Sequence, residues 1–229
     1  SDVCSSDLNF SELENLRLEK LLQLRQNGIE PYPTRSYKNS SNADAIKAFE
    51  AREAASQPEE LRLTLAGRLR AIRNMGKLSF AHIEDRTGKI QLFMRVNELG
   101  QEKLDHFVRF YDLGDYIEAT GTMVRTRRGE VTLQVEDFRM LAKALYQLPA
   151  AKDEIVDGEV IRHAALTDPE TRYRQRYVDL AVNPEVRDIF RVRTETLKAL
   201  REFLDERGFQ EVETPILQPI YGGAAAKPF

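Results

Sequence analysis

Residues 77–96 read KLSFAHIEDRTGKIQLFMRV, and this stretch decides the fold. Apolar and polar residues alternate on both sides of a turn, which predicts strands over Lys77–Asp85 and Ile90–Val96 joined as a hairpin. In the first strand, Ala81 and Ile83 mark the core side, so Phe80 faces outward. The second strand alternates in the same way, with Ile90, Leu92, Met94 and Val96 on its core side and Gln91, Phe93 and Arg95 on its outer side.

Three further runs with the same period of two flank this hairpin. They cover Leu63–Arg70, Tyr116–Val124 and Val131–Leu141, and a helical pattern at Gln101–Tyr111 separates the third predicted strand from the fourth. Three strands, a helix and two strands are the element order of the OB-fold, a five-stranded Greek-key barrel. An SH3-like barrel is the alternative, and the helix after the third strand favours the OB-fold.

Two glycines inside the predicted strands, Gly67 and Gly121, support a closed barrel. A glycine within a strand marks a bulge or a sharp bend, which a small barrel needs in order to close. We therefore place the OB domain at residues 63–148.

The segment before the barrel is predicted to be helical. Residues 1–10 have no periodicity and are expected to form a disordered leader. Within residues 11–62, Ser11 or Asn9 caps a helix with a leucine stripe, and Gly28 ends it. A second, short helix is expected around Ala45–Ala54.

The segment after the barrel is predicted to be a connector at residues 149–182, followed by a long helix and a strand. Asp168-Pro169 and Asn183-Pro184 are helix start signals. The helix beginning at Asn183 spans about 24 residues and breaks at Gly208, and a short strand then runs to Pro215. Its apolar face predicts a partner chain or further sequence that covers it. The fold class is therefore α+β.

Composition and charge restrict the class of protein. With 41% hydrophobic and 31% charged residues, the chain is globular, and no apolar run reaches the roughly 20 residues of a membrane span. The single cysteine forms no internal disulfide, which suits a cytoplasmic location, and three scattered histidines make a structural zinc site improbable. The net charge is −3, whereas residues 64–145 carry +3, so a slightly basic module lies within an acidic chain.

The outer side of the predicted hairpin suits a nucleobase. OB-folds bind single-stranded nucleic acid on the face of strands two and three. Phe80 offers a ring for stacking, Gln91 an amide for a base edge, and Arg95 a cation for phosphate. From spacing alone, the alternative remains that Phe80 is a core aromatic and Gln91 a solvated strand residue.

Several short segments resemble bacterial-type class II lysyl-tRNA synthetases over residues 12–229. The stretch RGFQEVETPIL at residues 207–217 resembles motif 1 of that family, the helix and strand that form its dimer interface. The remaining matching segments are Asn74–Phe80, Gly88–Leu92, Leu113–Asp115, Lys143–Leu145 with Leu148-Pro149, and Arg172–Leu180. Each is moderately specific alone, and their order makes the match strong.

The resemblance implies an anticodon-binding role for the barrel, with tRNA(Lys) as partner. Phe80 would stack on an anticodon base, and Gln91 would hydrogen-bond a uridine edge. Arg73 and Glu130 match further anticodon-contacting positions. An amide both donates and accepts, whereas an ionised carboxylate only accepts, so Glu130 would favour a base that presents an N–H.

The resemblance also assigns roles to the C-terminal segment. Phe209, Val212 and Pro215 would belong to the motif 1 interface of a homodimer. Gly222 would line the amino-acid pocket, and Lys227 stands where arginine is frequent in the family. ATP and Mg²⁺ are implied for the full-length enzyme, which ligates lysine to tRNA, but their residues lie in motifs 2 and 3, past the end of this chain. We therefore expect no catalytic residue and no metal site here, and no aminoacylation by the chain alone.

Three alternatives remain open. The chain could derive from an aspartyl- or asparaginyl-tRNA synthetase, because these share the OB domain and motif 1, although Arg172–Leu180 and the Gly-Gly-Ala stretch favour lysine. It could be a non-enzymatic OB-fold binder of single-stranded nucleic acid, which would show no anticodon preference. It could also be a dimerisation module whose RNA face is idle.

Overall fold

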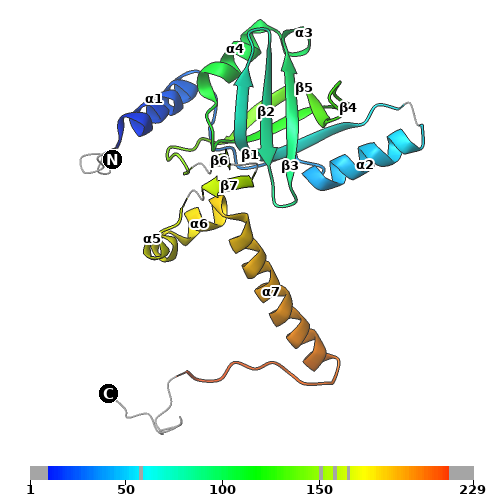
Figure 1. The fold of residues 1–229 in the computed structure, drawn as a ribbon, viewed down its shortest axis with the longest axis vertical. Coiled ribbons are helices and arrows are strands. Elements are labelled where there is room, and N and C mark those ends of the chain that lie inside the picture. The colour runs from blue at the N-terminus through cyan, green and yellow to red at the C-terminus, as the bar shows by residue number, and fades with distance from the viewer. Residues whose placement is uncertain (1–9, 57–58, 150–151, 157–158, 164–165, 217–229) are drawn as a thin grey trace. The chain divides into compact units, whose positions relative to one another are not determined.

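The computed structural model describes residues 10–56, 59–149, 152–156, 159–163 and 166–216 (Figure 1). The chain divides into two compact units, Ser1–Gln147 and Leu148–Phe229. Apart from Phe10, the leader expected at residues 1–10 lies outside the described residues.

A closed five-stranded barrel forms the centre of the first unit. Its strands are β1 (Arg62–Asn74), β2 (Leu78–Glu84), β3 (Lys89–Arg95), β4 (Tyr116–Arg125) and β5 (Val131–Ala142). They follow the order β1-β2-β3-β5-β4, and all neighbours are antiparallel except β3 and β5, which pair in parallel. The α+β class and the predicted OB-fold are confirmed.

The barrel interior follows the predicted alternation. Ala81 and Ile83 of β2 and Ile90, Leu92 and Met94 of β3 are buried in one apolar core. Between β3 and β4 lie α3 (Val96–Leu99) and α4 (Gln101–Phe110), and Phe107 of α4 is fully buried in the same core. Val96 begins α3 instead of ending the strand, because the chain leaves the sheet after Arg95.

Gly121 sits where two strands approach too closely for a side chain. A Cβ atom there would lie 1.9 Å from the carbonyl oxygen of Gln134, and the register of β4 and β5 shifts between Thr120 and Gly121. At Gly67 a Cβ atom would lie 2.8 Å from the carbonyl oxygen of Glu84. Both glycines therefore allow the close backbone contacts of a tightly closed barrel, as their positions predicted.

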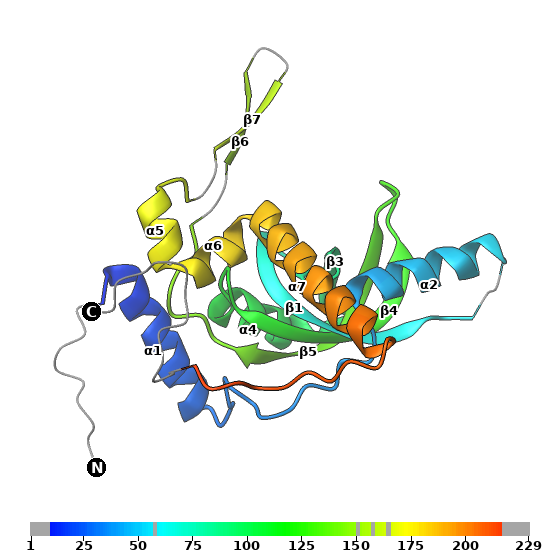
Figure 2. The ribbon, with the colours of Figure 1, turned by 90° about the horizontal axis from the view of Figure 1, so that it is seen from below.

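Two helices precede the barrel and lie at opposite sides of it (Figures 1 and 2). They are α1 (Glu12–Gln26) and α2 (Asn42–Ala54). Ser11 caps α1 and forms a reciprocal capping box with Glu14, which satisfies backbone donors at the helix start. Only part of the leucine stripe of α1 is buried. Leu21 and Leu24 are buried, whereas Leu13, Leu16 and Leu22 are exposed.

Charged side chains tie α1 to the point where the chain leaves β5. The buried Arg17 donates to the carbonyl oxygens of Leu113 and Ala144, each at 3.0 Å. Nearby, the fully buried ammonium group of Lys143 lies 2.7 Å from the buried carboxylate of Asp115. Arg17 therefore fixes the N-terminal helix to the barrel, and the ion pair joins the two chain segments next to β4 and β5 beside it.

The second unit contains a hairpin and three helices. Strands β6 (Lys152–Val156) and β7 (Glu159–His163) pair in antiparallel fashion, and α5 (Pro169–Arg174), α6 (Arg176–Val182) and α7 (Pro184–Asp205) follow. Asp168 caps α5, as its position before Pro169 predicted. The hairpin was not predicted.

The segment after α7 corrects one prediction. The helix ends near Gly208, which has a φ of 80°, as expected. The strand expected before Pro215 is absent from the described residues, since 209–216 have no strand pairing. A strand exists only through ladder hydrogen bonds to a neighbouring strand, and 209–216 form no such ladder in the described part of the chain. Glu211 instead pairs with Arg201 at 3.1 Å.

Candidate nucleic-acid interface on the outer face of the barrel

Two phenylalanine rings stack on the outer face of β2 and β3. Phe80 and Phe93 are direct partners in the antiparallel register, their ring centroids are 4.7 Å apart, and their planes differ by 10°. Both side chains are half-buried, because each covers part of the other. The guanidinium group of Arg95 lies 5.6 Å from the centroid of the Phe93 ring. The outer face thus carries a flat aromatic platform beside a cation.

Beside this platform, the amide of Gln91 is held at both ends. Its Nε2 atom donates to Oε2 of Glu130 at 2.7 Å, and its Oε1 atom accepts from the hydroxyl of Thr132 at 3.0 Å. Gln91 and Thr132 are partners in the parallel pairing of β3 with β5. The closure of the barrel therefore places a hydroxyl next to the amide.

Glu130 ends the turn between β4 and β5 and reaches over two strands. Besides its contact with Gln91, its Oε1 atom lies 3.1 Å from Nε2 of His82. Phe80, Gln91 and Glu130 thus lie on one face, which joins three of the positions taken from the family resemblance.

Arg73 lies at the edge of the same face. It is exposed near the end of β1, and its Cα partner across the sheet is Phe80. Further exposed cations border the face in the adjoining turns, namely Lys77, Arg86, Arg127 and Arg128. This arrangement provides positive charge around a stacking platform, the combination that single-strand binders use.

Sequence reasoning missed two members of this face. His82 shares a side of β2 with Phe80, so the alternation that exposed Phe80 also pointed to it. Thr132 gave no comparable signal, because its proximity to Gln91 depends on a parallel pairing between residues that are 41 positions apart.

Asp85 fixes the hairpin loop that supports this face. Its carboxylate accepts from Lys38 at 2.6 Å and from the backbone nitrogen of Asn42 at 3.1 Å. Burial raises the pKa of Asp85, but these bonds and those from Thr87 outweigh it and lower the pKa to about 2. The carboxylate is therefore ionised at neutral pH, and it joins the loop to the start of α2.

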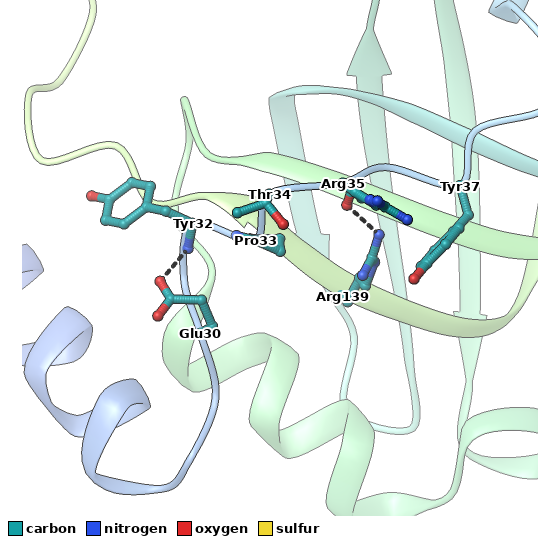
Figure 3. A pocket seen from close by; sticks show the side chains of 7 residues that line it. All are labelled: Glu30, Tyr32, Pro33, Thr34, Arg35, Tyr37 and Arg139. Carbon is teal, nitrogen blue, oxygen red and sulfur yellow. Dashed lines mark hydrogen bonds between the residues drawn. The ribbon is translucent and has the colours of Figure 1, made fainter.

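A pocket on another side of the barrel is braced by internal bonds (Figure 3). The guanidinium group of Arg139 lies 4.5 Å from the Tyr37 ring centroid, donates to the carbonyl oxygen of Arg35 at 2.7 Å, and pairs with Glu118. The lining residues are Glu30, Tyr32, Pro33, Thr34, Arg35, Tyr37 and Arg139. Because Arg139 is already paired in this way, we interpret the pocket as part of the packing contact between the segment after α1 and the barrel.

The remaining predicted positions lie apart from this face. Phe209, Val212 and Pro215 are exposed in the segment after α7, within the second unit. Gly222 and Lys227 lie outside the described residues. Among the residues that the structure describes, no group of three or more His, Cys, Asp or Glu could hold a metal ion. In the same part of the chain no helix is long and apolar enough to cross a membrane.

Comparison with known families agrees with this geometry. Residues 63–141 match the family described as OB-fold nucleic acid binding domain, and residues 168–229 match the family described as tRNA synthetases class II (D, K and N). The two matches occur in the order that the resemblance implied. The chain therefore belongs to the class II tRNA synthetases of this group.

Curated relatives narrow the resemblance to one member of the group. A lysine–tRNA ligase of Carboxydothermus hydrogenoformans is 46% identical over 96% of this chain and 41% of the relative. Lysine–tRNA ligases of a Roseiflexus species and of Clostridium tetani are 45% and 41% identical over 97% and 100% of the chain, and each match covers 42% of the relative. The chain thus spans about two fifths of the length of these lysine–tRNA ligases.

Proposed function

We propose that this chain is the anticodon-reading part of a lysine–tRNA ligase and binds tRNA(Lys). The observation that carries the proposal is the stacked pair of Phe80 and Phe93 beside the bonded amide of Gln91, on the OB-fold face that binds single strands. Similarity to lysine–tRNA ligases over almost the whole chain supports it.

In this proposal, affinity and discrimination come from different groups. Phe80 stacks on an anticodon base, which is worth about 1–3 kcal/mol and depends little on the identity of the base. Gln91 and Glu130 read polar edges, because their donors and acceptors fit only some bases. Arg73, next to Phe80 in the sheet, contacts the anticodon and adds attraction to phosphate.

The proposal extends to a full-length lysine–tRNA ligase that contains this chain. That enzyme ligates lysine to tRNA with ATP and Mg²⁺ and acts in the cytoplasm, where translation takes place. The family resemblance assigns ATP and Mg²⁺ to motifs 2 and 3, so the residues described here are assigned tRNA binding and not the ligation itself. The exposed apolar side of α7, together with Phe209, Val212 and Pro215, forms the contact of a homodimer, and Gly222 lines the amino-acid pocket.

A binding titration tests the proposal. The purified 229-residue chain is titrated at fixed salt against an anticodon stem-loop carrying UUU and against loops with each uridine changed. Replacing the central uridine is expected to cost roughly 1–3 kcal/mol. Gln91→Ala is expected to remove this preference, whereas Phe80→Ala is expected to weaken binding to all the loops. Equal binding to all loops by a chain whose circular dichroism matches the folded barrel would overturn the proposal.

A second candidate is the same role in an aspartyl- or asparaginyl-tRNA synthetase. The matching family covers all three amino acids, so its description alone leaves them together. Stem-loops carrying the aspartate or asparagine anticodon in the same titration separate the candidates. Stronger binding to either loop than to UUU would replace the lysine assignment and keep the anticodon-reading role.

A further inference from the structure

We propose that His82 links RNA binding on this face to the uptake of a proton. The chain gains the proton at the contact of His82 with Glu130 when the anticodon loop binds, so the affinity for RNA rises as the pH falls from 8 to 6. This inference rests on the proposed function, because it concerns the same face and the same RNA. His82 acts through Glu130 and is therefore a positioning residue.

His82 lies in the middle of the candidate interface. It is the direct partner of Gln91 in the antiparallel register of β2 and β3, and the next pair along the same face is Phe80 with Phe93. The His82 side chain is 34% exposed, so it is open to solvent in the free chain. The groups proposed to hold the RNA thus lie on both sides of the imidazole.

His82 and Gln91 share one carboxylate. Oε1 of Glu130 lies 3.1 Å from Nε2 of His82, and Oε2 accepts from Nε2 of Gln91 at 2.7 Å. Because an ionised carboxylate only accepts, Nε2 of the imidazole carries a proton in this contact. A second proton, taken from the solvent, would therefore bind to Nδ1. The resulting imidazolium would form a charge-assisted hydrogen bond to Glu130, which is stronger than the neutral one.

The other charged groups around His82 are mostly cations. Glu84, on the same side of β2, pairs with Arg70 of β1, and its partner in the register of β3 is Lys89. Exposed cations border the face on β1 and in the turn after β4, namely Arg73, Arg127 and Arg128. These cations attract phosphate, so bound RNA brings negative charge close to the imidazole.

Bound RNA changes the energy of the His82–Glu130 contact in two ways. A base that sits on Glu130 removes water from its carboxylate, which is costly unless the carboxylate is paired with a cation. The phosphates add negative charge, which favours a positive imidazole. The pair carries one negative charge when His82 is neutral and none when it is protonated. The complex therefore holds more protons than the free chain, and its affinity increases as the pH falls.

The experiment measures the affinity of the 229-residue chain for the UUU stem-loop at pH 6, 7 and 8 and constant ionic strength. Histidine ordinarily changes its charge in this range, whereas phosphodiesters and uracil keep theirs. We expect roughly three- to tenfold tighter binding at pH 6 than at pH 8, the effect of up to one proton per complex. Calorimetry in buffers of different ionisation heat should detect the proton uptake itself.

Two histidine variants separate His82 from the rest of the chain. His82→Gln keeps a side-chain donor for Glu130 but cannot be protonated, so it should lose most of the pH dependence. A purely structural contact would not move this profile. His106→Gln is the matched control and should keep the dependence, because His106 lies on α4, outside the strands of this face, with its ring 4.8 Å from that of Phe110.

Thermal melting checks that both variants fold. If His82→Gln does not fold, nuclear magnetic resonance of the imidazole protons in the unmodified chain supplies the same comparison. The titration of His82 should then move to higher pH when the stem-loop is added.

The outcomes separate this inference from the function beneath it. Equal binding of all loops by the unmodified, folded chain at pH 7 would overturn the anticodon-reading role and this inference with it. A clear uridine preference with the same affinity at pH 6 and pH 8 would overturn the inference alone. A pH dependence that His82→Gln retains would do the same, because the proton would then bind elsewhere.

Discussion

The barrel and α7 contain similar kinds of apolar residue but bury them differently. Leu92 and Ile83 of the barrel are fully buried, and their core draws on the strands and on α1 to α4. In α7, Val186 is buried, whereas Ile189 is 66% and Leu200 56% exposed. Periodicity therefore identifies an apolar face, whereas the burial of that face depends on which other elements pack against it.

The largest expected loss of stability comes from removing one partner of the buried ion pair in the barrel unit. Lys143→Met leaves Asp115 as a buried charge without its partner, which should lower the free energy of unfolding by about 3–5 kcal/mol. Chemical denaturation measures it. Lys103→Met is the matched control, because Lys103 pairs with Asp137 at the surface and should change stability little. Equal effects of the two substitutions would contradict the role given to the buried pair.

The same leucine-to-alanine change in the barrel core and on α7 tests the difference in burial between the two regions. Leu92→Ala should lower the free energy of unfolding by about 2–5 kcal/mol, because it leaves a cavity in the core. Leu200→Ala, the same substitution on α7, should change it by less than about 0.5 kcal/mol in the monomer. Urea titration at low protein concentration distinguishes them. A large loss for Leu200→Ala under those conditions would mean that α7 is covered within a single chain.

Asp85 gives the barrel unit a predicted pH dependence. Its pKa in the fold is about 2, below the ordinary value of 3.8, so its contribution is present above about pH 4 and is lost as the pH falls toward 2. The shift corresponds to about 2 kcal/mol. Asp85→Asn should flatten this part of the stability profile measured by denaturation at several pH values. An unchanged acid slope in the variant would assign the loss to other carboxylates.

The smallest expected effect on stability concerns the uncovered face of α7. Leu197 is half-exposed, so Leu197→Gln should leave the unfolding of the barrel unchanged within about 0.5 kcal/mol. If this face forms a dimer contact, the same substitution should lower the dimer fraction measured by analytical ultracentrifugation. Glu195→Gln, a change to a polar residue of the same helix, serves as the control. Loss of barrel stability without any change in association would contradict the view that this face of α7 lies outside the packed core and forms a dimer contact.

The sequence was sufficient to predict the strands of the barrel, but it did not predict every contact of the candidate site. Alternation placed all five strands and set Phe80 and Gln91 on the outer face, because a period of two is fixed by the strand itself. Contacts that arise from closure were not visible. The parallel pairing of β3 with β5 brings Thr132 beside Gln91, and no local pattern encodes it.

In the second unit, one element was missed by the sequence analysis and another was predicted wrongly. The hairpin of β6 and β7 was missed, although Asp157-Gly158 between two short apolar runs is a recognised hairpin signal. The strand predicted before Pro215 was wrong, because its residues favour extension but extension alone forms no ladder. Roles at Phe80, Arg73 and Glu130 stay predictions, since their chemistry concerns a partner and not the fold.

The brace between α1 and the barrel has a consequence for synthesis of the chain. Arg17 and its acceptor at Ala144 are 127 residues apart, so α1 leaves the ribosome long before its binding site exists. At about 5–20 residues per second, the interval is roughly 6–25 s. During this time Leu21 and Leu24 have no core to enter, and the helix is available to chaperones. Docking of α1 therefore marks the completion of the barrel and not its beginning.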